Sequence, residues 1–295
     1  MDPASVIEIV RAQFPEVRGR TSSFLGGGCD SDAYEIDGEW VFRFPKRADV
    51  AAQLAVERAI LPRIASVLPV PVPSFLYFGR PSPMFPFHFA GYRRLDGEPA
   101  LRLPSHVMPL GPLASSLARS LSALHAFAVE DAEARGVATQ PIDAVIDEAR
   151  ADALGAFEQV ASASPESPLD AWRRYLRAGI EPPRGAPATL LHNDLAAEHV
   201  LIDAKAKKVT GIIDWSDVAI GEPAADFAGI FHWGGETLLR RVIAEYCGRL
   251  DAAQLACARY LAACRGASDV RFGTETGRPE YVAAGIAALE GAARL

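Results

Sequence analysis

The sequence predicts an α+β protein of two lobes, with a β-rich first third and a mostly helical remainder. Up to about residue 95, runs of alternating apolar residues are separated by turn residues, as in an antiparallel sheet. Beyond it, apolar residues recur every three to four positions, the spacing of helices that bury one face. We therefore expect a β-rich lobe over 1–95, a hinge at about 92–97 and a helical lobe over 98–295.

Composition narrows the class of protein. Of the 295 residues, 49% are hydrophobic, enough for a sizeable core, and a net charge of -7 without any basic block disfavours nucleic acid as a partner. Asp2 and Glu8 interrupt the first segment, and no run of about eighteen apolar residues occurs, so we expect neither a signal peptide nor a membrane span. The four cysteines lack metal-site spacing and fit a reducing compartment. We expect a cytoplasmic monomer.

The first lobe is predicted to contain a glycine-rich loop between strands. A helix ending at Pro15 precedes the stretch Phe24–Ser31, and an Asp37-Gly38 turn then forms a hairpin with the strand Trp40–Pro45. In a Rossmann unit or a P-loop the glycines would open a helix, but a strand follows here and no GxxxxGK[ST] is present. Kinases use this order to lay backbone amides over nucleotide phosphates. A flexible surface turn remains the alternative at this point.

Arg43 favours the phosphate-binding interpretation. Phe42 and Phe44 flank it, so Arg43 points to the opposite face of the sheet, beneath the glycine loop. The next segment, Ala48–Ile64, is predicted to be helical and carries Glu57. In kinases, a cation on this strand and a carboxylate on this helix hold the α- and β-phosphates; arginine supplies the charge in a fork geometry where lysine is usual.

The predicted strand Phe85–Leu95 leads into the hinge, whose exposed backbone would hydrogen-bond a purine edge. Phe87 or Phe89 would line the floor of that pocket, although a strand phenylalanine more commonly packs in the core. A bulky Phe87 near that pocket would disfavour adenine. Helices are then expected at about Leu113–His125, Ile142–Ala163, Leu169–Ala178, Glu236–Arg249, Ala252–Cys264 and Glu280–Ala293. His125 is expected to be a hydrogen-bonded core residue.

Two buried strands of the second lobe end in acidic residues. Ala188–Leu191 is followed by His192-Asn193-Asp194, and Val209–Ile213 by Asp214. Buried carboxylates cost desolvation free energy, so they usually serve chemistry or a metal. Phosphoryl transfer needs one carboxylate at the nucleophile and another on Mg²⁺. Since no GxSxG and no HExxH motif occurs, a serine hydrolase and a zinc enzyme are excluded.

On these motifs the chain resembles the bacterial antibiotic kinases, namely the aminoglycoside phosphotransferases and their macrolide phosphotransferase relatives, which have a protein-kinase-like fold. The resemblance extends over nearly the whole chain and rests on the glycine loop with Asp30-Ser31, VFRFP, Glu57, Phe89–Tyr92, His192–Asp194, His199–Asp203, Gly211–Asp217 and a closing helix at Phe272–Leu289.

The resemblance implies a role for each of these residues. Asp194 would be the catalytic base, His199 and Asp214 would bind Mg²⁺, and Asp226 would brace the catalytic loop. The residues implied to bind ATP or GTP are Gly26, Gly28, Ser31, Arg43, Glu57, Phe89 and Tyr92. Because Arg43 and His199 depart from the commonest kinase residues, an inactive nucleotide-binding pseudokinase is the non-enzyme alternative. Retention of Asp194 and Asp214 argues against it.

The resemblance also implies a small-molecule antibiotic as the acceptor and a role in resistance. A 2″-like aminoglycoside is the first expectation, with Asp217, Glu222 and Glu236 near its ammonium groups. The stretch Phe227–Leu239 is largely apolar, however, and Glu236 is its only acid. Such a wall would suit a macrolide, so a macrolide 2′-phosphotransferase remains an alternative, as does a kinase of another hydroxylated metabolite.

Overall fold

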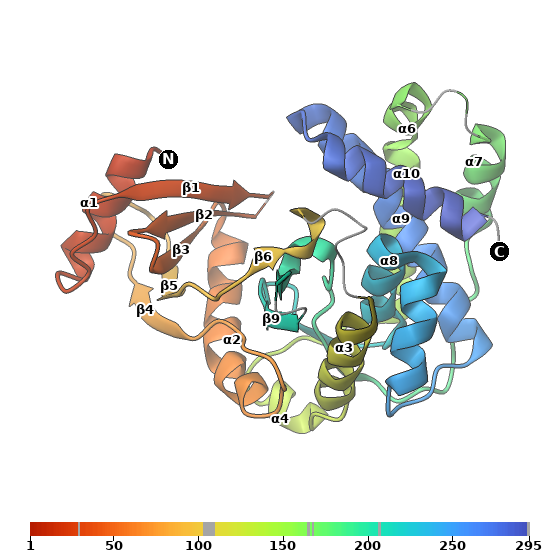
Figure 1. Cartoon of the computed structure of the whole chain (residues 1–295), viewed down its shortest axis with the longest axis horizontal. Coiled ribbons are helices and arrows are strands. Elements are labelled where there is room, and N and C mark those ends of the chain that lie inside the picture. Colours follow the sequence, from red (N-terminus) through yellow and green to blue (C-terminus); the bar gives the residue numbers. More distant parts are fainter. Residues whose placement is uncertain (29, 103–109, 164–165, 167, 206–207, 294–295) are drawn as a thin grey trace.

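The computed structural model of the chain describes residues 1–28, 30–102, 110–163, 166, 168–205 and 208–293. They form a smaller lobe around an antiparallel sheet and a larger, mainly helical lobe, as predicted (Figure 1). The elements of the smaller lobe and the connection are α1 Pro3–Gln13, β1 Ser22–Gly27, β2 Ser31–Ile36, β3 Trp40–Pro45, α2 Ala48–Ala65, β4 Phe75–Gly79, β5 Phe89–Arg93, β6 Glu98–Pro99 and η1 Ala100–Arg102.

The remaining elements belong to the larger lobe. Its helices are α3 Leu110–His125, α4 Val129–Glu133, α5 Ile142–Gly155, α6 Phe157–Ala163, α7 Leu169–Ala178, η2 Ala197–His199, α8 Ala224–Glu245, α9 Ala252–Thr276 and α10 Pro279–Ala293. Its strands are β7 Thr189–Leu191, β8 Val200–Asp203, β9 Lys208–Ile212 and β10 Ala219–Gly221. Within the described residues, no helix is long and apolar enough to cross a bilayer.

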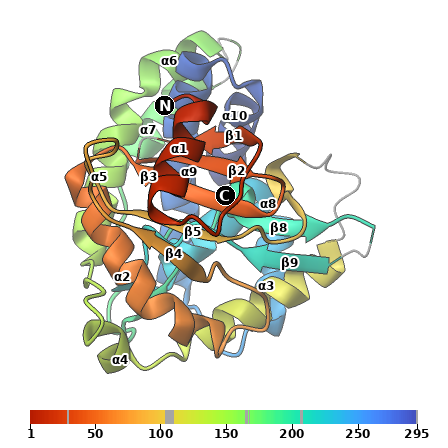
Figure 2. The ribbon, with the colours of Figure 1, turned by 90° about the vertical axis from the view of Figure 1, so that its left-hand side faces the viewer.

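The smaller lobe is a five-stranded antiparallel sheet in the order β1-β2-β3-β5-β4. The predicted hairpin is confirmed, because Asp37 and Gly38 turn with φ of 53° and 71° between β2 and β3. Helix α1 lies in front of the sheet in Figure 2 and packs its apolar side on one face. The core there consists of Val6, Ile9, Val10, Val17, Tyr34, Ile36, Phe42, Phe44 and Phe89. The opposite face, which carries Val41 and Arg43, lines the cavity described below.

Helix α2 connects the cores of the two lobes. It carries Glu57 beside β3, while Ile60, Leu61 and Ile64 belong to the larger apolar cluster. In addition, the amide of Ile212 at the end of β9 donates to the carbonyl of Pro71, 3.0 Å away. The smaller lobe is therefore attached to β9, the strand that precedes Asp214, in two ways besides the covalent chain. These are the packing of α2 and the hydrogen bond from Ile212 to Pro71.

In the larger lobe, α8, α9 and α10 pack around a common core with α3 and α5. Helices α9 and α10 approach closely, since a Cβ at Gly285 would lie 2.2 Å from the carbonyl oxygen of Gly266. Three short strands, β6, β8 and β9, form one sheet, and β7 pairs with β10 in another. Leu191 and Ile212, which precede the two acidic clusters, are both buried.

Several helix boundaries differ from the predictions. The expected helix Ile142–Ala163 is two helices, separated at Ala156, and α8 begins at Ala224 with a break at Gly235. The prediction of one closing helix over Phe272–Leu289 is wrong: α9 continues to Thr276 and ends at Gly277, a left-handed cap with φ 68°, before α10 starts. Helical spacing alone does not locate such caps.

The cysteines provide a test of the packing. Cys247 is exposed, whereas Cys257 and Cys264 are buried, and burial raises the pKa of both to about 12. A thiol with so high a pKa is almost never a reactive thiolate. We predict that in a Cys29→Ser variant one thiol reacts rapidly with a disulfide reagent at a pH of about 8, and two more only in denaturant. Rapid reaction of three thiols in the folded protein would contradict this packing.

Candidate active site

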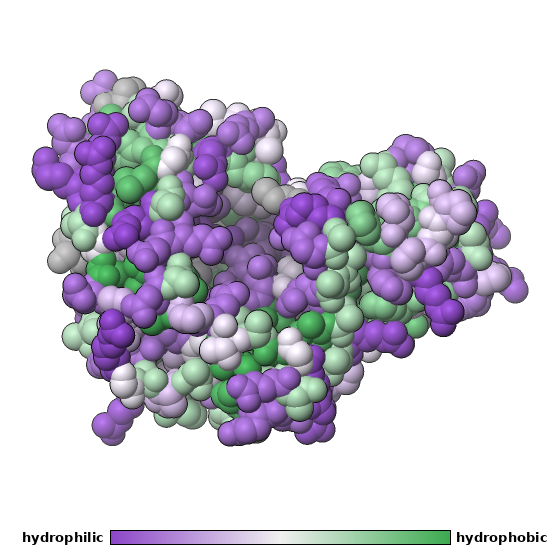
Figure 3. Space-filling view, turned by 180° about the vertical axis from the view of Figure 1, so that it is seen from behind, coloured by the Kyte–Doolittle hydropathy of each residue, from purple (hydrophilic) through white to green (hydrophobic). Residues whose placement is uncertain are grey.

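A cavity of about 480 Å³ lies between the lobes. Its walls come from the glycine loop, β3, the segment after β5, the segments after β7 and β9, and the helices α9 and α10. Figure 3 shows the hollow between the two lobes, with a mainly hydrophilic visible rim. The predicted site residues that line it are Gly26, Gly28, Ser31, Arg43, Tyr92, Asp194, His199, Asp214 and Asp217.

Arg43 joins the two lobes through two carboxylates. Its Nη1 lies 2.7 Å from Oε2 of Glu57, and its Nη2 lies 3.0 Å from Oδ1 of Asp214. Glu57 is only 1% exposed, so its charge depends on Arg43 for compensation. The structure therefore confirms the predicted direction of Arg43 and its pairing with Glu57, and it adds a bond to Asp214 that strand alternation could not reveal.

Asp226 holds the segment that carries Asp194. Its buried carboxylate accepts hydrogen bonds from the amides of His192, at 3.1 Å, and Asn193, at 2.7 Å. His125 adds a third contact through Nε2 at 3.1 Å, and its Nδ1 lies 2.8 Å from the Tyr246 hydroxyl. The segment needs this support because Asn193 has a φ of 67°, an unfavourable backbone conformation for a residue with a side chain. His125 is thus a hydrogen-bonded core residue, as expected.

His199 and Asp214 meet at the same wall of the cavity. Nδ1 of His199 lies 2.7 Å from the backbone oxygen of Asp194 and must donate to it, which leaves Nε2, 3.7 Å from Oδ2 of Asp214, as the ring nitrogen that would bind a metal. Burial lowers the pKa of His199, but the carboxylates of Asp194 and Asp214 outweigh it and raise the pKa to about 9. A metal bound at Nε2 would therefore displace a proton.

The donor set at this wall fits Mg²⁺ bound together with phosphate. No group of three or more His, Cys, Asp or Glu side chains in the described part of the chain is arranged to hold a metal by itself. Magnesium does not require one, because it is commonly held by one or two protein ligands, water and substrate phosphates. Asp214 supplies a carboxylate, and its φ of 60° directs it back towards Arg43 and His199.

Arg265 of α9 is a site residue that the sequence did not indicate. Its Nη1 is bonded to Oδ1 of Asp194, and its Nη2 lies 3.1 Å from Oε1 of Glu198. Burial would raise the pKa of Asp194, but the charges of Arg265 and His199 hold that pKa well below its usual range. The only available signal was the i,i+4 pair of Arg265 and Asp269, which the predicted end of the helix at Cys264 concealed.

Phe89 lies outside the cavity, in the core beneath α1. In the β3–β5 register Arg43 pairs with Ala90 and Phe42 with Gly91, so Phe89 shares its face of the sheet with Phe42. It is 0% exposed, and its ring fills the space beside Gly79. Phe87 contacts Phe85 and does not line the cavity either. Neither phenylalanine can form the floor of a purine pocket in this structure.

Of the three acids expected to contact an acceptor, only Asp217 lines the cavity. Glu222 accepts a hydrogen bond from Nε2 of Gln254, 2.6 Å away, and Glu236 is paired with Arg240 and Arg259. Burial, together with the charges of Asp194 and Asp214, raises the pKa of Asp217 to about 6. Glu222 and Glu236 thus have internal partners and lie away from the cleft.

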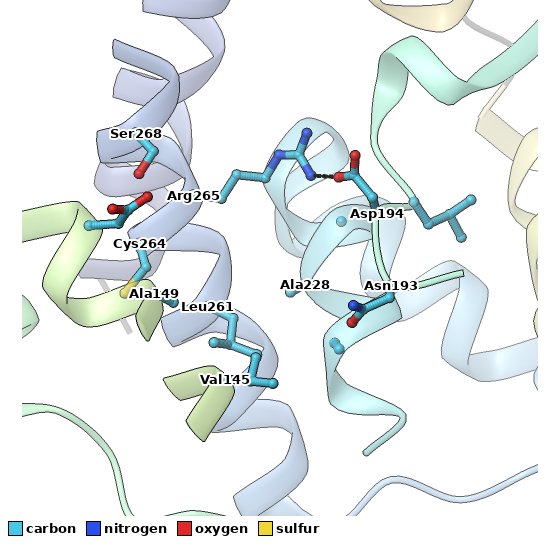
Figure 4. Close-up of a pocket in the computed structure, with 13 residues that line it drawn as sticks. Val145, Ala149, Asn193, Asp194, Ala228, Leu261, Cys264, Arg265 and Ser268 are labelled. Atoms are coloured by element: carbon cyan, nitrogen blue, oxygen red, sulfur yellow. Dashed lines mark hydrogen bonds and ion pairs between the residues drawn. The ribbon is translucent and has the colours of Figure 1, made fainter. Parts of the chain in front are cut away.

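A second cavity, of about 240 Å³, lies on the other side of Asp194, between α5, α8 and α9 (Figure 4). It shares only Asp194 and Arg265 with the larger cavity among the described residues. In Figure 4, Arg265 extends from α9 across the gap to Asp194, with apolar side chains below the pair. The apolar residues that line this cavity include Val145, Ala149, Leu195, Ala225, Ala228 and Leu261.

Comparison with known proteins identifies the family. The model of the phosphotransferase enzyme family matches residues 21–261, which span most of both lobes and contain the site residues named above except Arg265 and Asp269. The chain belongs to this family. It is therefore a small-molecule kinase with a protein-kinase-like fold, as the sequence motifs implied.

Individual relatives of this phosphotransferase are distant. A viomycin phosphotransferase of Streptomyces vinaceus is 29% identical over 116 residues, which cover 31% of this chain and 40% of that protein. The GDP and kanamycin complex of an APH(2″) enzyme is 25% identical with a TM-score of 0.72, and covers 97% of both chains. A macrolide 2′-phosphotransferase from Brachybacterium faecium, at 24% identity, TM-score 0.65 and 97% coverage of both chains, shares the fold.

Asp226 offers a test of how the phosphotransferase supports the loop that carries Asp194. In an Asp226→Asn variant, an amide group would replace one of the two oxygens that accept from His192, Asn193 and His125. Removing one partner of a buried charged network costs about 3 kcal/mol, so we predict this loss in free energy of unfolding, measured by urea denaturation. Asp147→Asn, at an exposed i,i+3 pair, should change it by less than about 0.5 kcal/mol. Equal effects would contradict the bracing role.

Proposed function

We propose that this phosphotransferase transfers the γ-phosphate of ATP or GTP to a hydroxyl of a small-molecule antibiotic in the cytoplasm. The observation that carries the proposal is the placement of Asp194 and Asp214 on one wall of the cleft, with Arg43 bonded to Asp214. One carboxylate is then available at the acceptor hydroxyl and the other at the phosphates. Two half-buried acids with such separate partners are not expected in a protein that only binds nucleotide.

The donor nucleotide is assigned to the side of the cavity under the smaller lobe. Ala33, Val41, Leu201 and Ile213 offer an apolar slot for a base, next to Tyr92 and the chain after it. The backbone of the glycine loop at Gly26–Gly28 covers the phosphates, and Arg43 contacts their oxygens. Mg²⁺ held by His199 and Asp214 would neutralise charge on the phosphates.

Asp194 is the proposed base. The acceptor oxygen attacks the γ-phosphorus, the bond from that phosphorus to the β–γ bridging oxygen breaks, and the hydroxyl proton passes to Asp194. Asp226 keeps the carboxylate of Asp194 in place through the two amides that precede it. The nucleoside diphosphate is the leaving group.

For the acceptor, a 2″-like aminoglycoside remains our first candidate. The similarity to a kanamycin complex over 97% of both chains supports it, and Asp217 offers a carboxylate for an ammonium group. A macrolide is the second candidate, because Glu222 and Glu236 lie outside the cavity while Phe272 and Tyr281 form an aromatic part of its wall.

A phosphate-transfer screen tests the reaction and the acceptor together. Kanamycin, gentamicin, viomycin and a macrolide are each incubated with ATP and with GTP, using the wild type and Asp194→Asn. We expect wild-type transfer to kanamycin or gentamicin and a loss of about a hundredfold or more in Asp194→Asn. Transfer to the macrolide alone would overturn the first acceptor, and equal activity of the two proteins would refute Asp194 as the base.

The position of Phe87 predicts the outcome for the donor. Since Phe87 packs on Phe85 outside the cavity, its side chain cannot discriminate adenine from guanine by contact. Phe87→Met is therefore expected to leave the ratio of kcat/KM for ATP and GTP unchanged within about twofold. Val41→Phe, which adds bulk to the proposed base slot, should raise KM for both donors. A changed ratio of kcat/KM for ATP and GTP in Phe87→Met would contradict the position proposed here for the base.

A further inference from the structure

Both oxygens of Asp194 already face a nitrogen in the structure. Oδ1 is bonded to Nη1 of Arg265, and Oδ2 lies 3.4 Å from Nδ1 of His199. A carboxylate that accepts a proton from a hydroxyl must present an oxygen to it at hydrogen-bond distance. The contact with Arg265 obstructs that approach on one side, and the wall that carries His199 obstructs it on the other.

The same ion pair forms the partition between the two cavities. Asp194 and Arg265 are the only residues that line both among those described, and Figure 4 shows the arginine spanning the gap between α9 and the segment of Asp194. If the Arg265 side chain moved away, the larger cavity and the smaller apolar cavity would meet at the carboxylate of Asp194. An acceptor could then occupy both.

Arg265 can leave Asp194 without losing all its counter-charges. Its Nη2 lies 3.1 Å from Oε1 of Glu198, and its Nε lies 3.9 Å from Oδ2 of Asp269, one turn further along α9. Asp269 itself lies 3.0 Å from Nε2 of His232 on α8. A rotation of the arginine side chain away from Asp194 therefore gives up one ion pair and keeps the two with Glu198 and Asp269.

We propose that Arg265 is a gate on the base of this kinase. In the closed state it is bonded to Asp194 and separates the cavities; in the open state it rests on Glu198 and Asp269, and the acceptor hydroxyl takes its place on Asp194. This inference rests on the proposed function and narrows it. The acceptor carries a reactive hydroxyl and an adjoining apolar part, which enters the smaller cavity beside Val145 and Leu261.

The gate also protects the donor. While Arg265 is bonded to Asp194, a water molecule in the cleft is denied the base, so the γ-phosphate is not lost to hydrolysis before an acceptor arrives. With the gate removed, water takes the place of the acceptor: its oxygen bonds to the γ-phosphorus, the bond to the bridging oxygen breaks, and its proton passes to Asp194. The products are the nucleoside diphosphate and inorganic phosphate.

The experiment compares Arg265→Gln with wild type in MgATP and MgGTP, first with water as the only acceptor and then with kanamycin or the macrolide. We expect Arg265→Gln to release inorganic phosphate about tenfold faster in water and to lower the KM of the antibiotic severalfold. The double variant Arg265→Gln/Asp194→Asn should return phosphate release to the wild-type rate, because the freed base has been removed. Arg265→Lys, which keeps one charge, should lie between.

Arg259→Gln is the matched control, since Arg259 is on the same helix and paired with Glu236 outside both cavities. It should leave both rates unchanged. Unchanged or slower phosphate release in both folded variants, Arg265→Gln and Arg265→Lys, would overturn the gate, as would fast release that persists in the double variant. The proposed function fails separately, if wild type phosphorylates neither antibiotic nor any other acceptor of the screen.

Discussion

The buried carboxylate of Asp226 determines where the acidic residues of the cleft lie. It accepts from the amides of His192 and Asn193 and from the ring of His125, so three elements of the larger lobe converge on one charge. A fully buried carboxylate is stable only when such partners surround it, which constrains β7, α3 and the start of α8 together. Asp194 follows this anchored segment, and its backbone oxygen in turn orients His199.

A second set of charges connects the lobes. Arg43 comes from the sheet of the smaller lobe, Glu57 from α2 and Asp214 from the end of β9, yet Arg43 contacts both carboxylates directly. Because α2 also packs its last turns into the larger core, the arginine is held from both sides. A phosphate that entered the cleft would meet this arginine already oriented, which lowers the entropy cost of binding.

The side of the cleft that we propose binds the acceptor has a different character. Among the described residues on this side, Asp217 is the one carboxylate without an arginine partner. Asp194 and Glu198 are both bonded to Arg265. Nearby, Phe272, Tyr281 and the apolar cavity behind Asp194 provide nonpolar surface. Displacement of Arg265 from Asp194 and burial of apolar surface would then both contribute to the choice of acceptor. A row of carboxylates would not be needed for that choice.

Local sequence was sufficient for the two-lobed fold, the hairpin, the direction of Arg43 and its partner Glu57, because strand alternation and helical spacing act over a few residues. It also located Asp194, His199 and Asp214, since strand ends with acidic residues form recognisable motifs. Only the tertiary structure decided that Phe89 lies in the core, that Glu222 and Glu236 have internal partners, and that Arg265 reaches Asp194. These facts depend on sheet register and on how α8, α9 and α10 cross, and such contacts join residues far apart in the chain, which no local pattern records.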